Sequence, residues 1–131
     1  DHRIVAYEIG DRNDKKLVFE NFDHAVRLYP DAHPVFHSDR GFQYTSAGFH
    51  QKLMDAGMTQ SMSRVGKCTD NGAMESINGW LKEELFNDFK IKEKEDPIKC
   101  IEEYITFFNE QRPSYSLNYL TPKQFKEFFT P

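Results

Sequence analysis

Two acidic residues, Asp39 and Glu75, have side chains and a spacing that suit metal-dependent phosphoryl transfer. Asp39 follows the short apolar run Val35-Phe36-His37-Ser38, and 35 residues lie between it and Glu75. Carboxylate oxygens are hard ligands of the kind that Mg²⁺ prefers, and two of them on rigid elements can hold such an ion in a fixed geometry. The pair therefore indicates a magnesium site.

A polar helix face is expected to extend from Glu75. The pattern predicts a helix over residues 71–85, whose buried stripe would comprise Met74, Ile77, Leu81 and Leu85. At about 100° per residue, a separate polar face comprises Glu75, Asn78, Gly79 and Lys82. Glu75 would hold a metal ion there, and Lys82, about two turns further on, would contact a DNA phosphate or base. Taken by itself, the pattern of this helix favours an ordinary solvated surface over a binding face.

The elements that must position these residues form an alternating series. Strands are expected at 3–9, 35–38 and 58–63, and helices at 15–29, at about 46–56, at 71–85, from Asp96-Pro97 and from Thr121-Pro122. In the helix that opens at Asp96, the core positions are expected to be Ile98, Ile101, Ile105 and Phe108. The alternation predicts an α/β fold with parallel neighbouring strands. Ligands in such sheets collect beyond the carboxyl ends of strands, which is where Asp39 falls.

Composition favours a single globular domain over residues 1–131. Aromatic residues make up 15% of the chain, which argues against a disordered tail. The mean hydropathy is −0.73 and no apolar run approaches the ~20 residues that a membrane helix needs, so we expect a cytoplasmic protein without a membrane partner. The net charge of −4 argues mildly against nucleic acid. Residues 34–82, however, carry five basic and four acidic side chains, and Asp39 and Glu75 are two of those four.

The cysteines and histidines give no metal-binding pattern. Cys68 and Cys100 form no CxxC pair, so both are expected to be free, buried thiols. His33 and His37 are four residues apart, but Pro34 between them excludes a regular helical pair, and no zinc site is expected.

Three blocks carry a resemblance to a known family. The first is His37-Ser38-Asp39-Arg40-Gly41-Phe42-Gln43-Tyr44-Thr45-Ser46, and the second is Asp70-Asn71-Gly72-Ala73-Met74-Glu75-Ser76 with Leu81-Lys82-Glu83-Glu84. The third, a closing motif, is Phe108-Asn109-Glu110-Gln111-Arg112-Pro113 with Leu117-Asn118-Tyr119-Leu120-Thr121-Pro122. Together they resemble bacterial insertion-sequence transposases whose catalytic core is similar to retroviral integrase. Ser114 and Asn118 depart from the family pattern, in which His and Gly are more frequent.

The resemblance implies a fold and a set of roles. It implies a ribonuclease-H-like core lacking its first strands, followed by C-terminal helices, and Asp39 and Glu75 as catalytic ligands of Mg²⁺ or Mn²⁺. A third catalytic aspartate would lie upstream of residue 1. Lys82 and Asn78 would contact DNA near the transposon end, and Arg40 and Gln43 would shape the strand end or touch its backbone.

The implied activity is DNA transposition by a homo-oligomer assembled on transposon ends and target DNA. A water and then a DNA 3′-hydroxyl attack phosphodiesters, assisted by two metal ions. With two of three carboxylates, residues 1–131 alone are expected to be inactive. Two alternatives remain open. One is a ribonuclease-H-like nuclease that hydrolyses without strand transfer, and the other is a non-catalytic remnant that regulates transposition by binding DNA ends or transposase subunits.

Overall fold

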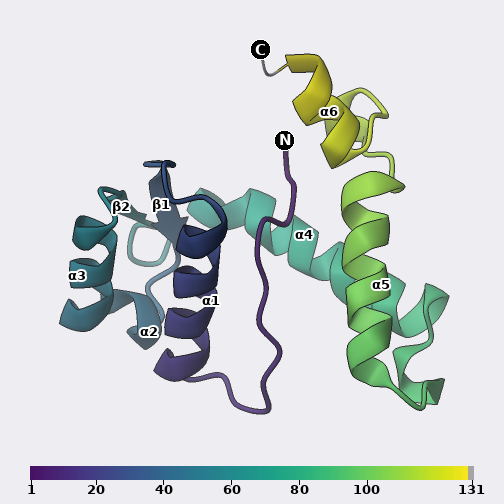
Figure 1. Ribbon diagram of the computed structural model, residues 1–131, viewed down its shortest axis with the longest axis horizontal. Coiled ribbons are helices and arrows are strands. Elements are labelled where there is room, and N and C mark those ends of the chain that lie inside the picture. Colours follow the sequence, from purple (N-terminus) through teal and green to yellow (C-terminus); the bar gives the residue numbers. More distant parts are fainter. Residues whose placement is uncertain (130–131) are drawn as a thin grey trace. The chain divides into compact units, whose positions relative to one another are not determined.

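The computed structural model describes residues 1–129, apart from the side chains of residues 68 and 69. In chain order its elements are α1 (Lys15–Leu28), β1 (Val35–Ser38), α2 (Phe42–Thr45), α3 (Ala47–Asp55), β2 (Thr59–Met62), α4 (Gly72–Glu83), α5 (Pro97–Glu110) and α6 (Pro122–Phe129) (Figure 1). A π-helical turn, Glu84–Asp88, follows α4 directly. The described helices include none that is long and apolar enough to span a membrane.

The chain divides into two compact units. The strand unit is Ala6–Ile77, and the helical unit comprises Asp1–Val5 and Asn78–Pro131, of which residues up to 129 are described. Each unit is treated by itself below, and the expectation of one domain over residues 1–131 stays a prediction.

The sheet of the strand unit consists of β1 and β2. The two strands pair in parallel, with Val35 opposite Thr59 and Ser38 opposite Met62. Both strands and their parallel pairing were predicted, and the structure confirms them. The apolar start of β1 also predicts burial, and that prediction was wrong: Val35 is 64% exposed, and of the four residues of β1 only Ser38 is buried. Among the described residues β1 has a strand neighbour on one side only, so its other edge is not covered by a strand.

Aromatic rings form the core of the strand unit. Phe49 and Leu53 of α3 are fully buried, and Phe22 of α1 lies against them. The Phe49 ring centroid lies 5.3–5.8 Å from four other rings, those of Phe19, Phe22, Phe36 and Tyr44. Phe36 belongs to β1, so this cluster holds the strand that leads directly into Asp39.

The helix starts follow from local capping chemistry. The Leu17 N–H donates to the Asp14 side chain, the Phe49 N–H to the Ser46 hydroxyl, and the Lys99 N–H to the Asp96 side chain. Each bond satisfies one of the N–H groups that a helix leaves unpaired at its first turn. These starts agree with the predicted ones. Gly57 ends the α3 region with a φ of +72°, a conformation that glycine adopts without steric cost.

The predicted strand over residues 3–9 does not form in the structure. The Ile4 N–H donates to the Asn109 side-chain oxygen at 2.8 Å, and the Asn109 amide donates to the Ile4 carbonyl at 2.9 Å. Both backbone groups of Ile4 are therefore paired with one side chain of α5. A period-2 pattern gives a strand only where another strand supplies the ladder, and among the described residues none does so here.

The core positions of α5 agree only in part with the expected ones: Phe108 is buried as predicted, but Ile101 and Ile105 are only half-buried. The buried residues are Cys100, Tyr104 and Phe108, whereas Ile98 is 52% exposed. The expected positions follow from helical spacing alone, whereas burial of Tyr104 depends on a partner for its hydroxyl, which donates to Glu84. Cys100 is a free, buried thiol as predicted. The same expectation for Cys68 lies outside the described side chains.

The predicted buried stripe of α4 was largely wrong. No residue of α4 is buried, Met74 is 49% exposed, and Leu85, which is buried, lies in the π-helical turn. The boundary between the two compact units falls inside α4, after Ile77. A helix that is divided in this way is not covered along its whole length by one core.

Candidate active site

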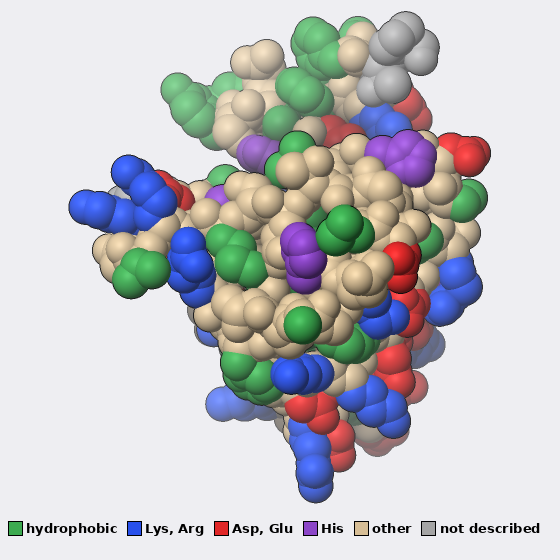
Figure 2. Space-filling model, turned by 90° about the vertical axis from the view of Figure 1, so that its left-hand side faces the viewer, with side chains coloured by type: hydrophobic (Ala, Val, Ile, Leu, Met, Phe, Trp, Pro, Cys, Tyr) green, Lys and Arg blue, Asp and Glu red, His purple; other side chains and the backbone are tan. Residues whose placement is uncertain are grey.

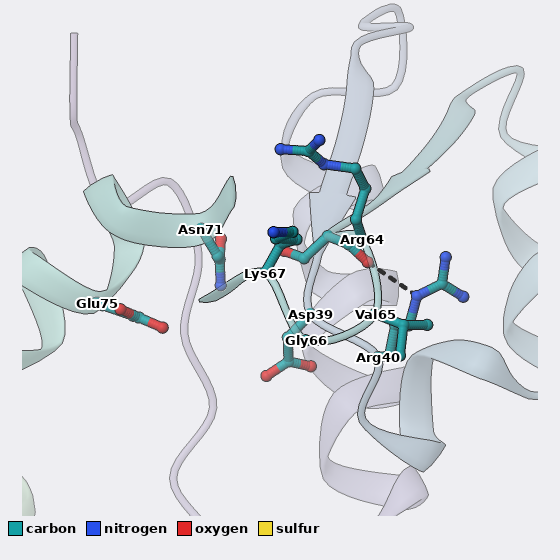
Figure 3. Close-up of a pocket in the computed structure, with 9 residues that line it drawn as sticks. Asp39, Arg40, Arg64, Val65, Gly66, Lys67, Asn71 and Glu75 are labelled. Atoms are coloured by element: carbon teal, nitrogen blue, oxygen red, sulfur yellow. Dashed lines mark hydrogen bonds between the residues drawn. The ribbon is translucent and has the colours of Figure 1, made fainter. Parts of the chain in front are cut away.

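A cleft of about 390 Å³ in the strand unit is lined by both predicted carboxylates (Figure 3). Asp39 is the first residue after β1, and Glu75 is the fourth residue of α4. Figure 3 shows the Glu75 side chain extending from α4 toward the side of the cleft on which Asp39 lies. The structure thus brings the two residues to one cleft, while their catalytic role stays a prediction.

A tight turn orients the Asp39 side chain. The Gly41 N–H donates to Asp39 Oδ1 at 2.8 Å. A Cβ at position 41 would lie 2.9 Å from the Gln43 side-chain oxygen and 3.1 Å from Asp39 Oδ1, so glycine allows this close approach. Burial and then the negative charge of Asp39 raise the pKa of Tyr44. The turn leaves the second carboxylate oxygen, Oδ2, available for a ligand.

Arg40 and Gln43, both predicted to contact DNA, have different surroundings. Arg40 lines the cleft, and its Nε donates to the Ser63 carbonyl at 2.8 Å, which leaves the terminal guanidinium nitrogens for other partners. Gln43 is 7% exposed, and its amide donates to the Asn13 side-chain oxygen at 3.2 Å. Gln43 thus makes an internal contact that connects the turn to the segment before α1, and its contact with DNA stays a prediction.

Six cleft residues were not identified from the sequence: Ser63, Arg64, Val65, Gly66, Lys67 and Asn71. They belong to the segment between β2 and α4, which joins the two carboxylate-bearing blocks. The presence of Arg64 and Lys67 in so short a connection could have indicated a phosphate-binding loop. The directions of their side chains, however, depend on how the loop folds.

Asp70 braces this loop through Arg64. It accepts hydrogen bonds from the Arg64 backbone N–H and from two guanidinium nitrogens, at 2.8–2.9 Å. Hydrogen bonds from Arg64 hold the pKa of the Asp70 carboxyl well below its usual range, and the same pairing raises the pKa of Arg64. The brace closes the loop a few residues before Glu75.

The cleft combines carboxylates with basic side chains. In Figure 3 the guanidinium groups of Arg40 and Arg64 point away from the Asp39 carboxylate. Figure 2 shows Lys and Arg side chains spread among Asp and Glu over the face in view, without one large basic patch. The charges in the cleft are therefore more informative about a ligand than those of the wider surface. A cation bound between the two carboxylates would make the cleft attractive to a phosphate.

The donor chemistry of the cleft suits Mg²⁺ or Mn²⁺, but the ligand set is small. Asp39 and Glu75 supply hard oxygen ligands. In the part of the chain that the structure describes, no group of three or more His, Cys, Asp or Glu side chains is gathered as a metal site. The residues present therefore fit part of a metal centre.

The polar face of α4 is exposed beyond Glu75. Asn78, Gly79 and Lys82 are all exposed, as expected for a face that meets solvent or a ligand. Asn78 and Lys82 belong to the helical unit and are not among the residues that line the cleft. Their contact with DNA stays a prediction.

Comparison with known proteins agrees with the sequence blocks. Two family models, each described as an integrase core domain, match residues 1–68 and 56–122. A transposase for insertion sequence element IS904 of Lactococcus lactis is 35% identical over 128 residues, which cover 96% of this chain and 51% of the relative. The insertion element IS600 uncharacterized 31 kDa protein of Shigella sonnei is 37% identical, over 95% of this chain and 46% of its own.

An uncharacterized transposase-like protein of Haemophilus influenzae is 34% identical, over 95% of this chain and 58% of its own. The chain spans about half the length of these curated relatives.

Proposed function

Because the chain belongs to the integrase core domain family, and its curated relatives include insertion-sequence transposases, we propose that it forms part of the catalytic core of a DNA transposase. The observation that carries the proposal is the shared cleft of Asp39 and Glu75. The same family membership supports an α/β fold, and we propose that it is the ribonuclease-H-like one.

The proposed reaction has two transfers at phosphorus. A water oxygen first attacks a phosphodiester at the end of the element, and the leaving group departs as a DNA 3′-hydroxyl. That 3′-hydroxyl then attacks a phosphodiester of the target: a new P–O bond joins the 3′ end of the element to the target 5′-phosphate, the P–O3′ bond of the target breaks, and the other target end leaves as a 3′-hydroxyl. Bound Mg²⁺ or Mn²⁺ supplies Lewis-acid activation of the attacking oxygen and neutralises charge on the phosphodiester.

The residues of this chain bind and orient the participants. Asp39 and Glu75 hold the metal ions, and the Gly41 N–H fixes one Asp39 oxygen so that the other is presented to the cleft. Arg40 and Lys67 line the same cleft and bind backbone phosphates. Lys82 and Asn78, exposed on α4, contact DNA near the end of the element.

We further propose that residues 1–131 by themselves neither cleave nor join DNA. Two-metal catalysis needs ligands for both ions in a shared geometry, and the described residues offer two carboxylates at the cleft. A third carboxylate from elsewhere in the complete polypeptide would finish the site. Assembly as a homo-oligomer on DNA and a cytoplasmic location belong to the same proposal.

The test is a cleavage and joining assay with the complete cellular polypeptide that contains residues 1–131. The substrate is a labelled duplex of the DNA that flanks the gene, with Mg²⁺ or Mn²⁺. We expect Asp39→Asn and Glu75→Gln each to abolish both steps. The matched controls are Asp55→Asn, exposed at the end of α3, and Glu83→Gln, exposed on the same helix as Glu75. Full activity in Asp39→Asn, or metal-dependent nicking by residues 1–131 alone, would refute the corresponding proposal.

A further inference from the structure

Arg112, from the closing motif of the sequence, lies at the centre of a half-buried polar cluster in the helical unit. Its Nε donates to Glu84 Oε1 at 2.6 Å, and the Tyr104 hydroxyl donates to the other Glu84 oxygen. The Arg112 and Glu84 side chains are 18% and 19% exposed, and Tyr104 is fully buried. We call these three residues the Glu84 cluster.

Aromatic contacts complete the surroundings of Arg112. Its guanidinium carbon lies 4.9 Å from the centre of the Trp80 ring and 5.6 Å from that of Phe108. Trp80 is on α4, and Glu84 opens the π-helical turn that follows it. Arg112 therefore contacts the last turn of α4 through an aromatic face and the π-helical turn that follows through a carboxylate, at two points four residues apart. A planar guanidinium can stack and form ion pairs at the same time, which an ammonium cannot.

The geometry of a helix relates this contact to Lys82. Residues 80 and 84 are separated by about 40° around the helix axis, whereas residue 82 lies about 160–200° from both. Trp80 and Glu84 are half-buried, and Lys82 is exposed. Holding the first two against Arg112 therefore determines the direction in which Lys82 points.

The Glu84 cluster also makes other rotations of α4 about its axis energetically unfavourable. A rotation of α4 that removed Glu84 from Arg112 would leave a half-buried charge and a buried tyrosine hydroxyl without partners, which is costly. Burial and the bond to Glu84 raise the pKa of Tyr104, consistent with a hydroxyl that stays protonated and keeps donating. Apolar packing alone would tolerate small rotations much better.

We propose that the Glu84 cluster is a positioning device that fixes the rotation of α4 about its own axis and thereby directs Lys82 at DNA phosphate. The inference rests on the proposed function, since it takes DNA as the partner of Lys82. Glu84, Tyr104 and Arg112 are positioning residues that act through Lys82. This proposal also gives the closing motif a role, because Arg112 of that motif contacts Trp80 on α4, the helix that carries Glu75.

The test is a double-mutant cycle on DNA binding by the complete polypeptide that contains residues 1–131. Affinity for a labelled duplex of the flanking DNA is measured at several salt concentrations for wild type, Lys82→Ala, Glu84→Gln and the double variant. Lys82→Ala should weaken binding and reduce the salt dependence by about one ion. Glu84→Gln should do the same, and the double variant should bind no more weakly than Lys82→Ala alone.

The sign of the Glu84→Gln effect separates positioning from simple charge. Removal of a carboxylate near DNA strengthens binding by charge alone, so severalfold weaker binding with a reduced salt slope points to a displaced Lys82. Glu83→Gln, the neighbouring exposed carboxylate, is the matched control and should leave the slope unchanged. Tyr104→Phe removes one oxygen atom and should weaken DNA binding as Glu84→Gln does. It is therefore the substitute variant if Glu84→Gln folds poorly.

Three results would overturn the inference: wild-type or tighter binding by folded Glu84→Gln, additive effects of the Lys82 and Glu84 substitutions, or no effect of Lys82→Ala. None of these depends on catalysis. If the binding cycle gives one of these three results but Asp39→Asn is inactive, the proposed function still holds and only the positioning role is refuted. If the binding cycle gives the expected result but Asp39→Asn is active, only the proposed function is refuted.

Discussion

Replacing Phe49 with alanine should strongly destabilise the strand unit. Phe49 is fully buried in α3, and four aromatic rings lie around it with centroids 5.3–5.8 Å away. One of them, Phe36, is in β1 and makes an edge-to-face contact with Phe49. The substitution therefore leaves a cavity directly beneath the strand that leads to Asp39.

The expected cost can be compared with the stability available. Truncation of a buried phenylalanine to alanine typically costs about 3–5 kcal/mol, and lost edge-to-face ring contacts put this site toward the upper end. A domain the size of Ala6–Ile77 has a free energy of unfolding of about 4–11 kcal/mol. Phe49→Ala should thus remove a third or more of the stability, and in the lower part of that range it leaves the unit unfolded.

The assay is urea denaturation followed by circular dichroism, with Phe42→Ala as the matched control. Phe42 is 59% exposed on α2, so its truncation should change the free energy of unfolding by less than about 1 kcal/mol. If the free energies of unfolding of the two variants differ by less than about 1 kcal/mol, the aromatic cluster does not stabilise this unit. The conclusion that Phe49 packing keeps β1 in place would then be wrong.

Three further predictions concern ionised and hydrogen-bonded groups. The pKa of Asp70 is depressed by Arg64, so the stabilisation from this pair should be present above the usual carboxyl pKa of about 4 and lost below it; Asp70→Asn should abolish this acid sensitivity in melting curves recorded against pH. The pKa of Tyr104 is raised, so its contribution should be complete below the usual phenol pKa of about 10 and disappear as the pH rises beyond that value; Tyr104→Phe should show no such alkaline loss. Arg112→Ala should destabilise the helical unit by about 3–5 kcal/mol in chemical denaturation, because it leaves the Glu84 charge unpaired. Lys99→Ala is the control and should change the free energy of unfolding little, since Lys99 is exposed on the same helix as Tyr104.

The features predicted correctly from sequence depend on local signals. Asp14, Ser46 and Asp96 cap helices through hydrogen bonds within three residues. The apolar run Val35–Ser38 ends in turn residues, and its pairing with Thr59–Met62 follows from the strand–helix–strand order. The placement of Asp39 and Glu75 at one cleft follows from these elements, since each residue lies at the end or near the start of one.

The features that the sequence did not predict depend on distant partners. Residues 3–9 alternate well, yet the Asn109 side chain, far along the chain, pairs with the backbone of Ile4. Gln43 is turned inward by Asn13, which no spacing rule relates to it. The bond between Glu84 and Arg112 spans 28 residues and that between Tyr104 and Glu84 spans 20, so no local pattern shows that the buried Tyr104 hydroxyl has a partner.

The central claim, that Asp39 and Glu75 hold a common divalent-metal site, is tested most directly by a Mn²⁺ titration of residues 1–131 followed by NMR. Bound Mn²⁺ broadens the signals of nearby nuclei, so the amides of Gly41 and Asn71, which report on the two sides of the cleft, should broaden together. Asp39→Asn and Glu75→Gln should each reduce the broadening at both amides. Broadening at Gly41 that is unchanged in Glu75→Gln would show that the two carboxylates bind metal independently and would contradict the account.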